Sequence, residues 1–290
     1  MVRVMNIIHN CRVIDSLEEF RQQISELKQQ KKTIGLVPTM GALHKGHLSL
    51  VQKSLARCDA TIVTIFVNPT QFAPTEDFAK YPRTLEHDLK LLGDLGPVIV
   101  FVPSTEVMYP EEFDTFVEVG GVARRLEGES RPTHFRGVAT VVLKLFMMSG
   151  ADVAYFGQKD FQQTRVIQKM VADLNLPIEI HVCPIIRESD GLAMSSRNRY
   201  LSSDERKQAL VLSQSLAKAE ELIRQGEKNA KTVREAMKNI LFTVPSAKID
   251  YIAVVDPETL EELSEIDRAV AILLAVTIGT TRLIDNVIVP

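Results

Sequence analysis

Short apolar runs alternate with amphipathic segments through the first two thirds of the chain. The runs have the length of strands and are mostly continuous rather than alternating; they lie at residues 33–39, 60–67, 97–102, 153–156 and 178–183. Apolar residues recur with helical spacing in segments between them, at residues 46–57, 83–92, 138–148 and 161–174. Continuous apolar strands are typical of a parallel sheet that is covered on both faces. Their alternation with helices predicts a doubly wound α/β domain.

The pattern changes after about residue 185. A long, charged amphipathic helix is predicted over residues 203–225, with Ser202 or Ser203 as its N-cap and Gly226 at its end. The other elements predicted in this part are one helix and two strands, at residues 232–242, 247–255 and 269–276. This mixture indicates a small α+β fold.

Length and composition agree with two globular domains. At ~150 residues per domain, the 290 residues predict about two. We expect a doubly wound parallel-sheet (Rossmann-like) nucleotide-binding domain at residues 1–185 and a smaller α+β domain at residues 186–290. Apolar residues make up 45% and charged residues 24%, which excludes disordered, collagenous and coiled-coil proteins. The net charge of −3 lacks the basic excess of a duplex-binding protein, so no nucleic-acid partner is expected.

The cysteines and the lengths of the apolar stretches indicate the cellular compartment of the protein. Cys11, Cys58 and Cys183 form no Cys-x-x-Cys pair, so neither a disulfide framework nor a structural zinc site is expected. Charges interrupt the apolar run in the first 12 residues, unlike in a secretory signal. The late apolar stretch at residues 269–281 is shorter than the ~18 residues that a membrane span needs. We therefore expect a cytoplasmic protein that has no membrane partner.

The polar segment at residues 38–47 reads Pro-Thr-Met-Gly-Ala-Leu-His-Lys-Gly-His and joins the first predicted parallel strand to the first predicted helix. Ligands of open α/β sheets bind outside the carboxyl ends of the strands, and a helix N-terminus favours phosphate. Gly41 and Gly46 allow the backbone to approach a ligand closely. His44 and His47 are three residues apart, so both imidazoles can face one way and stabilise a triphosphate. The alternatives are a helix cap with incidental histidines and a zinc site without an obvious third ligand.

Polar residues also follow two other predicted strands. The amides of Asn68 and Gln71 can donate and accept hydrogen bonds at once, which suits a hydroxy-acid substrate. A capped turn at Asn68-Pro69 is an equally good account. Lys159 can neutralise a phosphate, and a cation in a first helical turn opposes the helix dipole unless an anion binds there. Asp160 can bind a ribose hydroxyl or cap the helix.

The polar stretch at residues 187–199 contains three arginines. Its Ser195, Ser196 and Arg197 can coordinate phosphate oxygens. The four residues from Met194 to Arg197 are similar to the mobile Lys-Met-Ser-Lys-Ser loop of nucleotidyl-transferring enzymes. A solvated linker between the domains is the alternative.

A second polar connection, at residues 127–137, precedes an apolar helix. Arg131, His134 and Arg136 have the charge to line an acid-binding cleft. A surface loop is an equally good account of them.

Four of these segments together resemble the pantothenate synthetase (pantoate–β-alanine ligase) family. His-x-Gly-His at His44, Asn-Pro-x-Gln-Phe at Asn68, Gly-Gln-Lys-Asp-Phe-Gln-Gln at Gly157 and Met-Ser-Ser-Arg-Asn at Met194 occur in the expected order. The resemblance extends over residues 35–201 and more loosely beyond. His-x-Gly-His alone marks the wider nucleotidyltransferase superfamily, and the two later motifs narrow it to this family.

The resemblance implies a homodimeric, ATP-dependent ligase that condenses pantoate with β-alanine to pantothenate. AMP and pyrophosphate are released, and the reaction passes through an enzyme-bound pantoyl adenylate. Gln71 and Gln163 are implied to bind pantoate, and Gln71 also to contact β-alanine. His47, as proton donor, is expected to be catalytic together with His44 and Lys159. The implied ATP-binding residues are Met40, Gly41, Ala42, Leu43, His44, Lys45, Gly46, His47, Gly157, Gln158, Lys159, Asp160, Ile186, Met194, Ser195, Ser196 and Arg197.

Near the expected position of the metal, this sequence differs from that of some family members. Glu86-His87-Asp88 stands where some members have a more acidic run near magnesium. We therefore expect no protein ligand to a metal, and Mg²⁺ held mainly by the phosphates of ATP and by water.

Two other functions share part of the pattern. A simple nucleotidyltransferase has the same His-x-Gly-His turn but leaves a stable adenylyl or cytidylyl product, and it releases no AMP when an amine is added. A nucleotide-sensing module binds ATP without producing pyrophosphate.

Overall fold

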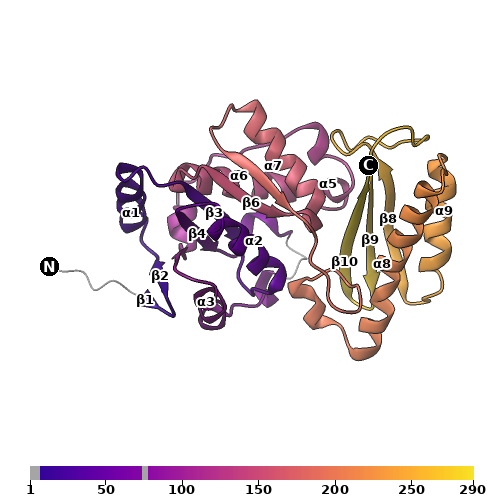
Figure 1. Ribbon diagram of the computed structural model, residues 1–290, viewed down its shortest axis with the longest axis horizontal. Helices are drawn as coiled ribbons and strands as arrows, with labels where there is room; N and C mark the ends of the chain where they lie inside the picture. The colour runs from indigo at the N-terminus through magenta and orange to yellow at the C-terminus, as the bar shows by residue number, and fades with distance from the viewer. Residues whose placement is uncertain (1–6, 74–77) are drawn as a thin grey trace. The chain divides into compact units, whose positions relative to one another are not determined.

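The computed structural model describes residues 7–73 and 78–290 and folds as two compact units (Figure 1). The units consist of the described residues of Met1–Ala123, Glu127–Gly157 and Gln163–Cys183, and of Arg124–Leu126, Gln158–Gln162 and Pro184–Pro290. Two short segments that precede residue 185 thus belong to the second unit, and the domain boundary at residues 185/186 stays a prediction. Residues 1–6, on which part of the expected compartment depends, lie outside the described residues.

A parallel sheet is the centre of the first unit. Within the described residues its strands are β1 (Ile7–Ile8), β2 (Cys11–Ile14), β3 (Ile34–Thr39), β4 (Ala60–Ile65), β5 (Val98–Phe101), β6 (Val153–Gly157) and β7 (Glu179–Cys183). Their order is β1-β2-β5-β4-β3-β6-β7, and all neighbouring pairs except β1 with β2 are parallel. The strand order reverses between β3 and β6. Their carboxyl ends therefore flank the switch point at which sheets of this kind bind ligands.

Helices accompany this sheet along the chain. They are α1 (Leu17–Gln29), α2 (Lys45–Leu55), α3 (Leu85–Gly93), α4 (Thr105–Met108), α5 (Glu127–Ser130), α6 (His134–Ser149) and α7 (Phe161–Asp173), with 3-10 turns η1 (Pro69–Gln71), η2 (Phe78–Lys80) and η3 (Gly121–Ala123). Val37, Val63 and Val100, from three adjacent strands, are completely buried. The predicted doubly wound α/β architecture is confirmed, and four of the five predicted runs are interior strands of the parallel sheet, while the run at residues 178–183 forms the edge strand β7.

Three elements near the N-terminus, β1, β2 and α1, were not predicted. β2 and α1 precede β3 and α2, so the description of 33–39 as the first parallel strand and of 46–57 as the first helix is wrong. Only Phe20, Gln23 and Ile24 of α1 are buried, so the helix has a narrow apolar face. β2 has only four residues, one of them Arg12. In sequence, neither α1 nor β2 has an apolar pattern strong enough to distinguish it from a polar loop.

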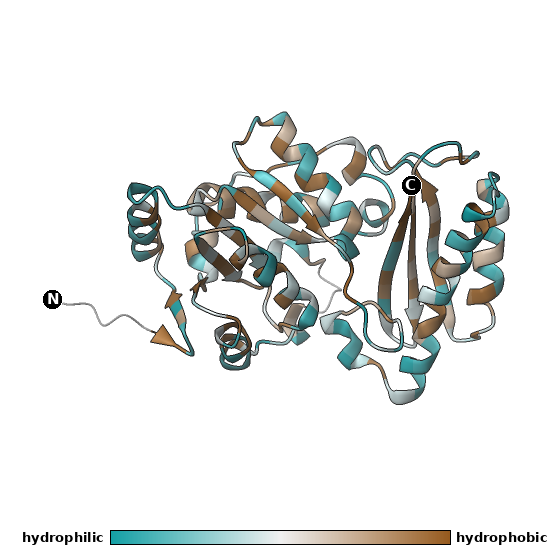
Figure 2. Cartoon of the chain, viewed as in Figure 1, coloured by the Kyte–Doolittle hydropathy of each residue, from teal (hydrophilic) through white to brown (hydrophobic). Residues whose placement is uncertain are grey.

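The second unit contains an antiparallel sheet of order β10-β9-β8. Its elements are η4 (Gln158–Asp160), η5 (Ser196–Tyr200), α8 (Ser203–Arg224), α9 (Ala230–Leu241), β8 (Ala247–Val255), β9 (Val270–Ile278) and β10 (Thr281–Val289). Ser202 caps α8 in a reciprocal capping box with Glu205, and Gly226 follows the helix with φ +96°. Figure 2 shows hydrophobic residues concentrated along the three strands, while the helices carry hydrophilic faces. The predicted α+β fold is confirmed.

The last strand, β10, was missed. Arg282, Asp285 and Asn286 interrupt its apolar residues, so the segment shows neither a continuous apolar run nor a regular alternation. Two of these residues, Asp285 and Asn286, are nevertheless 3% and 2% exposed, because their side chains are satisfied by hydrogen bonds inside the unit.

Candidate functional site

The turn between β3 and α2 carries the His-x-Gly-His motif. His44 is the N-cap of α2, and its Nδ1 accepts a 3.1 Å hydrogen bond from the backbone N–H of Gly46. Because the lone pair of Nδ1 is used, a neutral His44 carries its proton on Nε2. The ring centroids of His44 and His47 lie 4.1 Å apart. The structure thus brings two imidazoles together at a helix N-terminus, where an anion is favoured.

Asp88 of α3 holds the middle of this turn. Its carboxylate is completely buried and accepts hydrogen bonds from the backbone N–H groups of Ala42 (2.9 Å) and Leu43 (2.8 Å). The Thr84 hydroxyl lies 3.2 Å from each of its oxygens. Gly41 and Ala42 adopt φ values of +80° and +51°. The carboxylate therefore stabilises a left-handed backbone that would otherwise be strained at Ala42.

The role of Asp88 was missed, although the sequence contains a signal for it. Asp88 lies directly before Leu89 and four residues before Leu92, the two buried leucines of α3, so it occupies the apolar face of its helix. A carboxylate on a buried face requires hydrogen-bond donors, and here the donors come from a turn 45 residues earlier in the chain.

Gln71 lies at the end of β4, in the short turn η1. Its Oε1 accepts a 3.1 Å hydrogen bond from Asn68 Nδ2, and its Nε2 lies 3.0 Å from the Met40 sulfur. Asn68 is 1% exposed and caps η1 through Thr70, and its Oδ1 also accepts a 2.8 Å hydrogen bond from the Tyr109 hydroxyl. Of the two interpretations of Asn68, the structure therefore favours the capped turn, because its amide is fully occupied inside the protein.

The polar connection before α6 supports the backbone of Gln71. Arg131 Nη2 donates to the Gln71 carbonyl oxygen at 3.3 Å, and His134 Nδ1 lies 2.9 Å from the same oxygen. Arg136 instead lies over the Phe116 ring, 4.9 Å from its centroid. Of the three predicted cleft residues, Arg131 and His134 thus hold the backbone of Gln71 in place, and Arg136 packs against an aromatic ring.

Gly137 allows α6 to approach this turn. A Cβ at this position would collide with the Thr70 carbonyl group and the Gln71 backbone nitrogen. The Gly137 carbonyl oxygen accepts a 3.2 Å hydrogen bond from Asn68 Nδ2. The close contact of α6 with η1 therefore requires glycine here.

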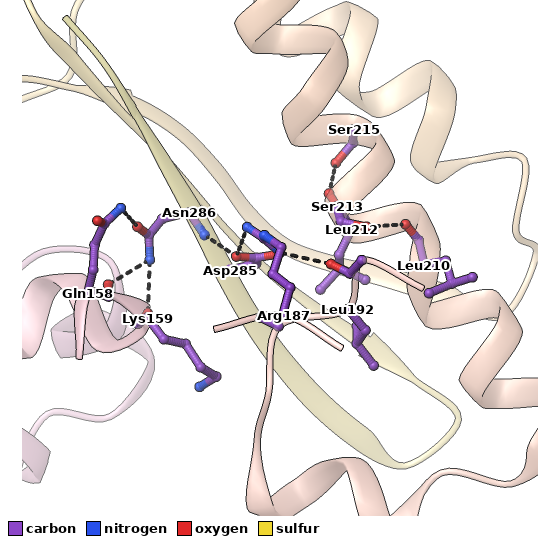
Figure 3. Close-up of polar contacts among 12 residues, drawn as sticks. Gln158, Lys159, Arg187, Leu192, Leu210, Leu212, Ser213, Ser215, Asp285 and Asn286 are labelled. Carbon is purple, nitrogen blue, oxygen red and sulfur yellow. Dashed lines mark hydrogen bonds and ion pairs between the residues drawn. The ribbon is translucent and has the colours of Figure 1, made fainter. Parts of the chain in front are cut away.

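In the second unit, η4 presents the predicted lysine. Lys159 has a side chain that is 20% exposed, and its Nζ lies 3.4 Å from Asp160 Oδ1. Asn286 of β10 holds the backbone of this turn, donating to the carbonyl oxygens of Gln158 (3.0 Å) and Lys159 (2.9 Å). The Lys159 side chain extends away from this contact (Figure 3).

The arginine-rich stretch is an ordered hairpin rather than a solvated linker. Arg187 pairs with Ala193 across an antiparallel bridge, and Gly191 at the turn has φ +96°. The Arg187 guanidinium forms two hydrogen bonds with the buried Asp285 carboxylate, of 2.7 and 3.0 Å. It also donates to the Gly191 carbonyl oxygen at 3.1 Å. This paired geometry fixes the hairpin against β10.

A second arginine holds the other side of the hairpin. Arg206 of α8 donates to Glu188 at 2.9 Å and to Asp190 at 2.7 Å. Burial alone would raise the pKa of Asp190, but the backbone N–H of Leu192 and the Arg206 guanidinium hold it below its ordinary value. Glu188 also accepts a 3.0 Å hydrogen bond from Asn198, which follows the predicted phosphate-binding serines.

The remaining predicted residues divide between the units. In the first, Lys45 is exposed at the start of α2, and Gln163 is half-buried in α7. Gly157 ends β6, and no atom lies within 4 Å of where its Cβ would be. In the second, the Met194 N–H donates to the Ile186 carbonyl oxygen at 2.9 Å, across the hairpin. Ser195 caps η5, which contains Ser196 and Arg197, and all three are half-buried.

The structure therefore places the predicted residues in two groups. In the first unit, the Met40 side chain contacts Gln71, and His44 contacts His47. In the second, the Lys159 turn and the Arg187 hairpin are both attached to β10. Across residues 7–73 and 78–290, no group of three or more His, Cys, Asp or Glu side chains is arranged to hold a metal ion.

Comparison with known proteins identifies the family. The family model for pantoate-beta-alanine ligase matches residues 12–288. A pantothenate synthetase of Thermotoga neapolitana is 54% identical over 277 residues, which are 96% of this chain and 99% of that protein. The chain belongs to the pantoate–β-alanine ligase family.

Solved structures agree with this assignment. A pantothenate synthetase from Thermus thermophilus aligns with a TM-score of 0.90 and 43% identity, over 95% of this chain and 98% of that one. A pantoate-beta-alanine ligase from Francisella tularensis, complexed with beta-gamma ATP and beta-alanine, aligns with a TM-score of 0.77 and 36% identity, over 95% and 96% of the two chains. The protein is thus a ligase. In the part of the ligase that the structure describes, no helix combines the length and hydrophobicity needed to cross a bilayer.

Proposed function

We propose that this ligase works through an enzyme-bound pantoyl adenylate. It condenses pantoate with β-alanine to pantothenate at the expense of ATP. A carboxylate is a poor electrophile, and an amine cannot displace an oxide from it. Adenylation supplies AMP as a leaving group, so the energy of ATP is used to make the acyl carbon reactive.

The observation that carries the proposal is the paired-histidine turn at the switch point of the sheet. The turn follows β3, and Gly157 ends the neighbouring strand β6 without any atom close to its Cβ position. This is the place at which open α/β sheets bind nucleotides. We assign ATP to the Met40–His47 turn, to residues 157–160, to Ile186 and to residues 194–197.

In the first step, a pantoate carboxylate oxygen attacks the α-phosphorus of ATP in line. The bond from that phosphorus to the oxygen that bridges to the β-phosphate breaks, and pyrophosphate leaves. Such a transfer needs positioning and charge stabilisation more than covalent chemistry. His44 and His47 lie together at a helix N-terminus, and Lys159 adds a cation, so we assign charge stabilisation to these three residues. We assign His47 as the donor of a proton to the departing pyrophosphate.

In the second step, the deprotonated amine of β-alanine attacks the acyl carbon, the bond to the AMP oxygen breaks, and the nitrogen releases a proton to solvent as the amide forms. No protein side chain has to form a covalent bond. This agrees with the cysteines: Cys11 and Cys183 are buried, and burial raises the pKa of both thiols.

Gln71 is our candidate for contact with both acceptor substrates. Its Oε1 accepts a hydrogen bond from Asn68, which orients the amide. Its Nε2 lies 3.0 Å from the Met40 sulfur, which is only a weak hydrogen-bond acceptor. A substrate carboxylate or hydroxyl is a stronger acceptor than a thioether. We assign Gln71 to pantoate and to β-alanine, and Gln163 to pantoate.

Among the described residues, the acid that contacts the turn is not available as a magnesium ligand. The two oxygens of Asp88 already accept hydrogen bonds from Ala42, Leu43 and Thr84. We propose that Mg²⁺ enters with ATP and is held mainly by the phosphates and water. From family membership we also propose a cytoplasmic homodimer without a nucleic-acid or membrane partner.

Product identification tests this function. The enzyme is incubated with ATP and pantoate, with and without β-alanine, and the products are identified. We expect AMP and pantothenate to be released in equal amounts only when β-alanine is present. A stable adenylyl product in the presence of the amine would indicate a simple nucleotidyltransferase. Binding of ATP without pyrophosphate release would indicate a sensor.

A further inference from the structure

The Lys159 turn is held by a residue 127 positions later in the chain. Asn286 is 2% exposed, and its side-chain amide forms three hydrogen bonds with η4 (Figure 3). Nδ2 donates to the carbonyl oxygens of Gln158 (3.0 Å) and Lys159 (2.9 Å), and Oδ1 accepts from Gln158 Nε2 (3.2 Å). Both donors and one acceptor site of the amide are used within a single turn.

These contacts determine the backbone at Lys159. η4 has only three residues, so its own helical hydrogen bonds do not order it well. A donor that bridges two successive carbonyl groups fixes the orientation of the peptide planes on both sides of the Lys159 Cα. The direction in which the lysine side chain leaves the backbone depends on those planes.

The neighbouring residue on β10 holds the other ATP segment. Asp285 is 3% exposed and forms the paired hydrogen bonds with Arg187 at the base of the hairpin. Its Oδ1 also accepts a 2.8 Å hydrogen bond from the Asn286 backbone N–H. Two consecutive residues of one strand therefore connect to both segments of the second unit that we assign to ATP.

We propose that Asn286, through its hydrogen bonds to the Gln158 and Lys159 carbonyl oxygens, is a positioning residue that holds Lys159 for the phosphates of ATP. The inference rests on the proposed function, because it takes Lys159 as the cation that faces ATP. The Asn286 side chain is engaged with Gln158 and Lys159, so no direct contact with a substrate is assigned to it. Its effect is transmitted through the backbone of η4.

The variant Asn286→Asp tests the proposal with the smallest change of shape. A carboxylate cannot donate to the two carbonyl groups and repels them. We expect kcat/KM for ATP to fall by about 10- to 100-fold, as misplacement of a catalytic group by about an ångström does. The control is Asn229→Asp in the same unit: Asn229 caps α9 by accepting hydrogen bonds, which an aspartate also does, so activity should stay unchanged.

A double-mutant cycle with Lys159→Ala separates positioning from general destabilisation. If Asn286 acts through Lys159, Asn286→Asp should lower kcat/KM for ATP by less than about twofold in the Lys159→Ala background. An equal loss in both backgrounds, or unchanged kinetics in folded Asn286→Asp, would overturn the proposal. Should the buried charge prevent folding, Asn286→Ala replaces it in the same cycle.

A measurement of ATP binding tests this inference separately from the proposed function. Calorimetric titration with MgATP needs no turnover. If the unaltered enzyme binds ATP but makes no pantothenate, the proposed function fails while the Asn286 inference is still tested. In that case, weaker ATP binding by Asn286→Asp than by Asn229→Asp supports it, and equal binding refutes it.

Discussion

The Asp88 carboxylate accepts a 2.8 Å hydrogen bond from the backbone N–H of Leu43. The next N–H toward the N-terminus, that of Ala42, bonds to the other oxygen of the same carboxylate. Helix α3 thereby determines the shape of the turn that leads into the paired histidines. Asp88 thus shapes the turn that we assign to ATP through hydrogen bonds to its backbone.

Replacing Asp88 by alanine should impair both stability and ATP use. Two buried N–H groups and the Thr84 hydroxyl would lose their acceptor, which costs about 2–4 kcal/mol of unfolding free energy. We expect kcat/KM for ATP to fall by at least about 10²-fold, because the turn loses its geometry. Urea unfolding and AMP release measure the two effects. The control is Asp94→Ala, at an exposed position that follows α3. If Asp88→Ala had the same stability and the same kcat/KM for ATP as this control, Asp88 would not have the structural role assigned to it.

His47→Ala and Lys159→Ala should lower turnover while leaving the fold intact. Removal of one well-placed donor to a developing charge typically costs ~10²–10³ in rate, and we expect at least that loss for each variant. The measurement is β-alanine-dependent AMP release, with circular dichroism as the check on folding. Lys169→Ala removes an exposed lysine of α7 and serves as the control. Near-wild-type turnover in either test variant would remove that residue from the mechanism.

Tyr109→Phe should affect pantoate more than ATP. The variant removes the hydroxyl that lies 2.8 Å from Asn68 Oδ1, and Asn68 in turn orients the Gln71 amide. We expect KM for pantoate to rise several-fold with little change in KM for ATP, and stability to fall by about 1 kcal/mol. Steady-state kinetics with each substrate varied in turn provides the test. Equal changes in both KM values would point to a general loss of structure instead.

The cysteines should be dispensable for catalysis. Cys58 Sγ lies 3.4 Å from the Tyr155 hydroxyl, and Cys183 is 2% exposed, so both pack inside the first unit. Since the proposed reaction needs no covalent intermediate, Cys58→Ser and Cys183→Ser should each keep at least about half of the wild-type kcat. A loss of about 10²-fold or more in a variant that remains folded would require a thiol in the mechanism.

Cys11 should make the protein less stable at alkaline pH. Burial raises the pKa of its thiol to about 11, above the ordinary value of 9.0. The folded state thus keeps a proton that the unfolded chain releases, so this contribution is complete below about pH 9 and is lost as the pH rises toward 11. Between pH 8 and pH 10, the stability difference between wild type and Cys11→Ala should shrink by about 1 kcal/mol. An unchanged difference in urea unfolding would show that the thiol titrates normally.

The parts of the fold that were predicted have strong local patterns. The interior strands β3, β4 and β5 are continuous apolar runs, and α8 has a long amphipathic face with a capping box. β10 was missed because its polar residues break the apolar pattern of a strand. They are compatible with a buried strand only because Asp285 and Asn286 find partners about 100 residues or more away in the sequence.

The candidate site was likewise predictable only where its residues lie close together in the sequence. The motifs around His44, Lys159 and Ser196 are continuous in sequence, so they could be proposed as site segments before the fold was known; their roles remain predictions. Asp88, Tyr109 and Asn286 act through contacts with residues 45, 41 and 127 positions away. A single sequence contains no record of such pairings, and only the fold brings the partners together.

The transfer of oxygen from pantoate to AMP tests the adenylate most directly. Pantoate labelled with ¹⁸O in its carboxylate is converted in the presence of ATP and β-alanine, and the AMP is analysed by mass spectrometry. The account predicts one ¹⁸O atom in each AMP molecule, because the carboxylate oxygen that attacks the α-phosphorus stays on the phosphate when the amine displaces it. AMP without the label, with ¹⁸O in pyrophosphate or inorganic phosphate instead, would contradict it.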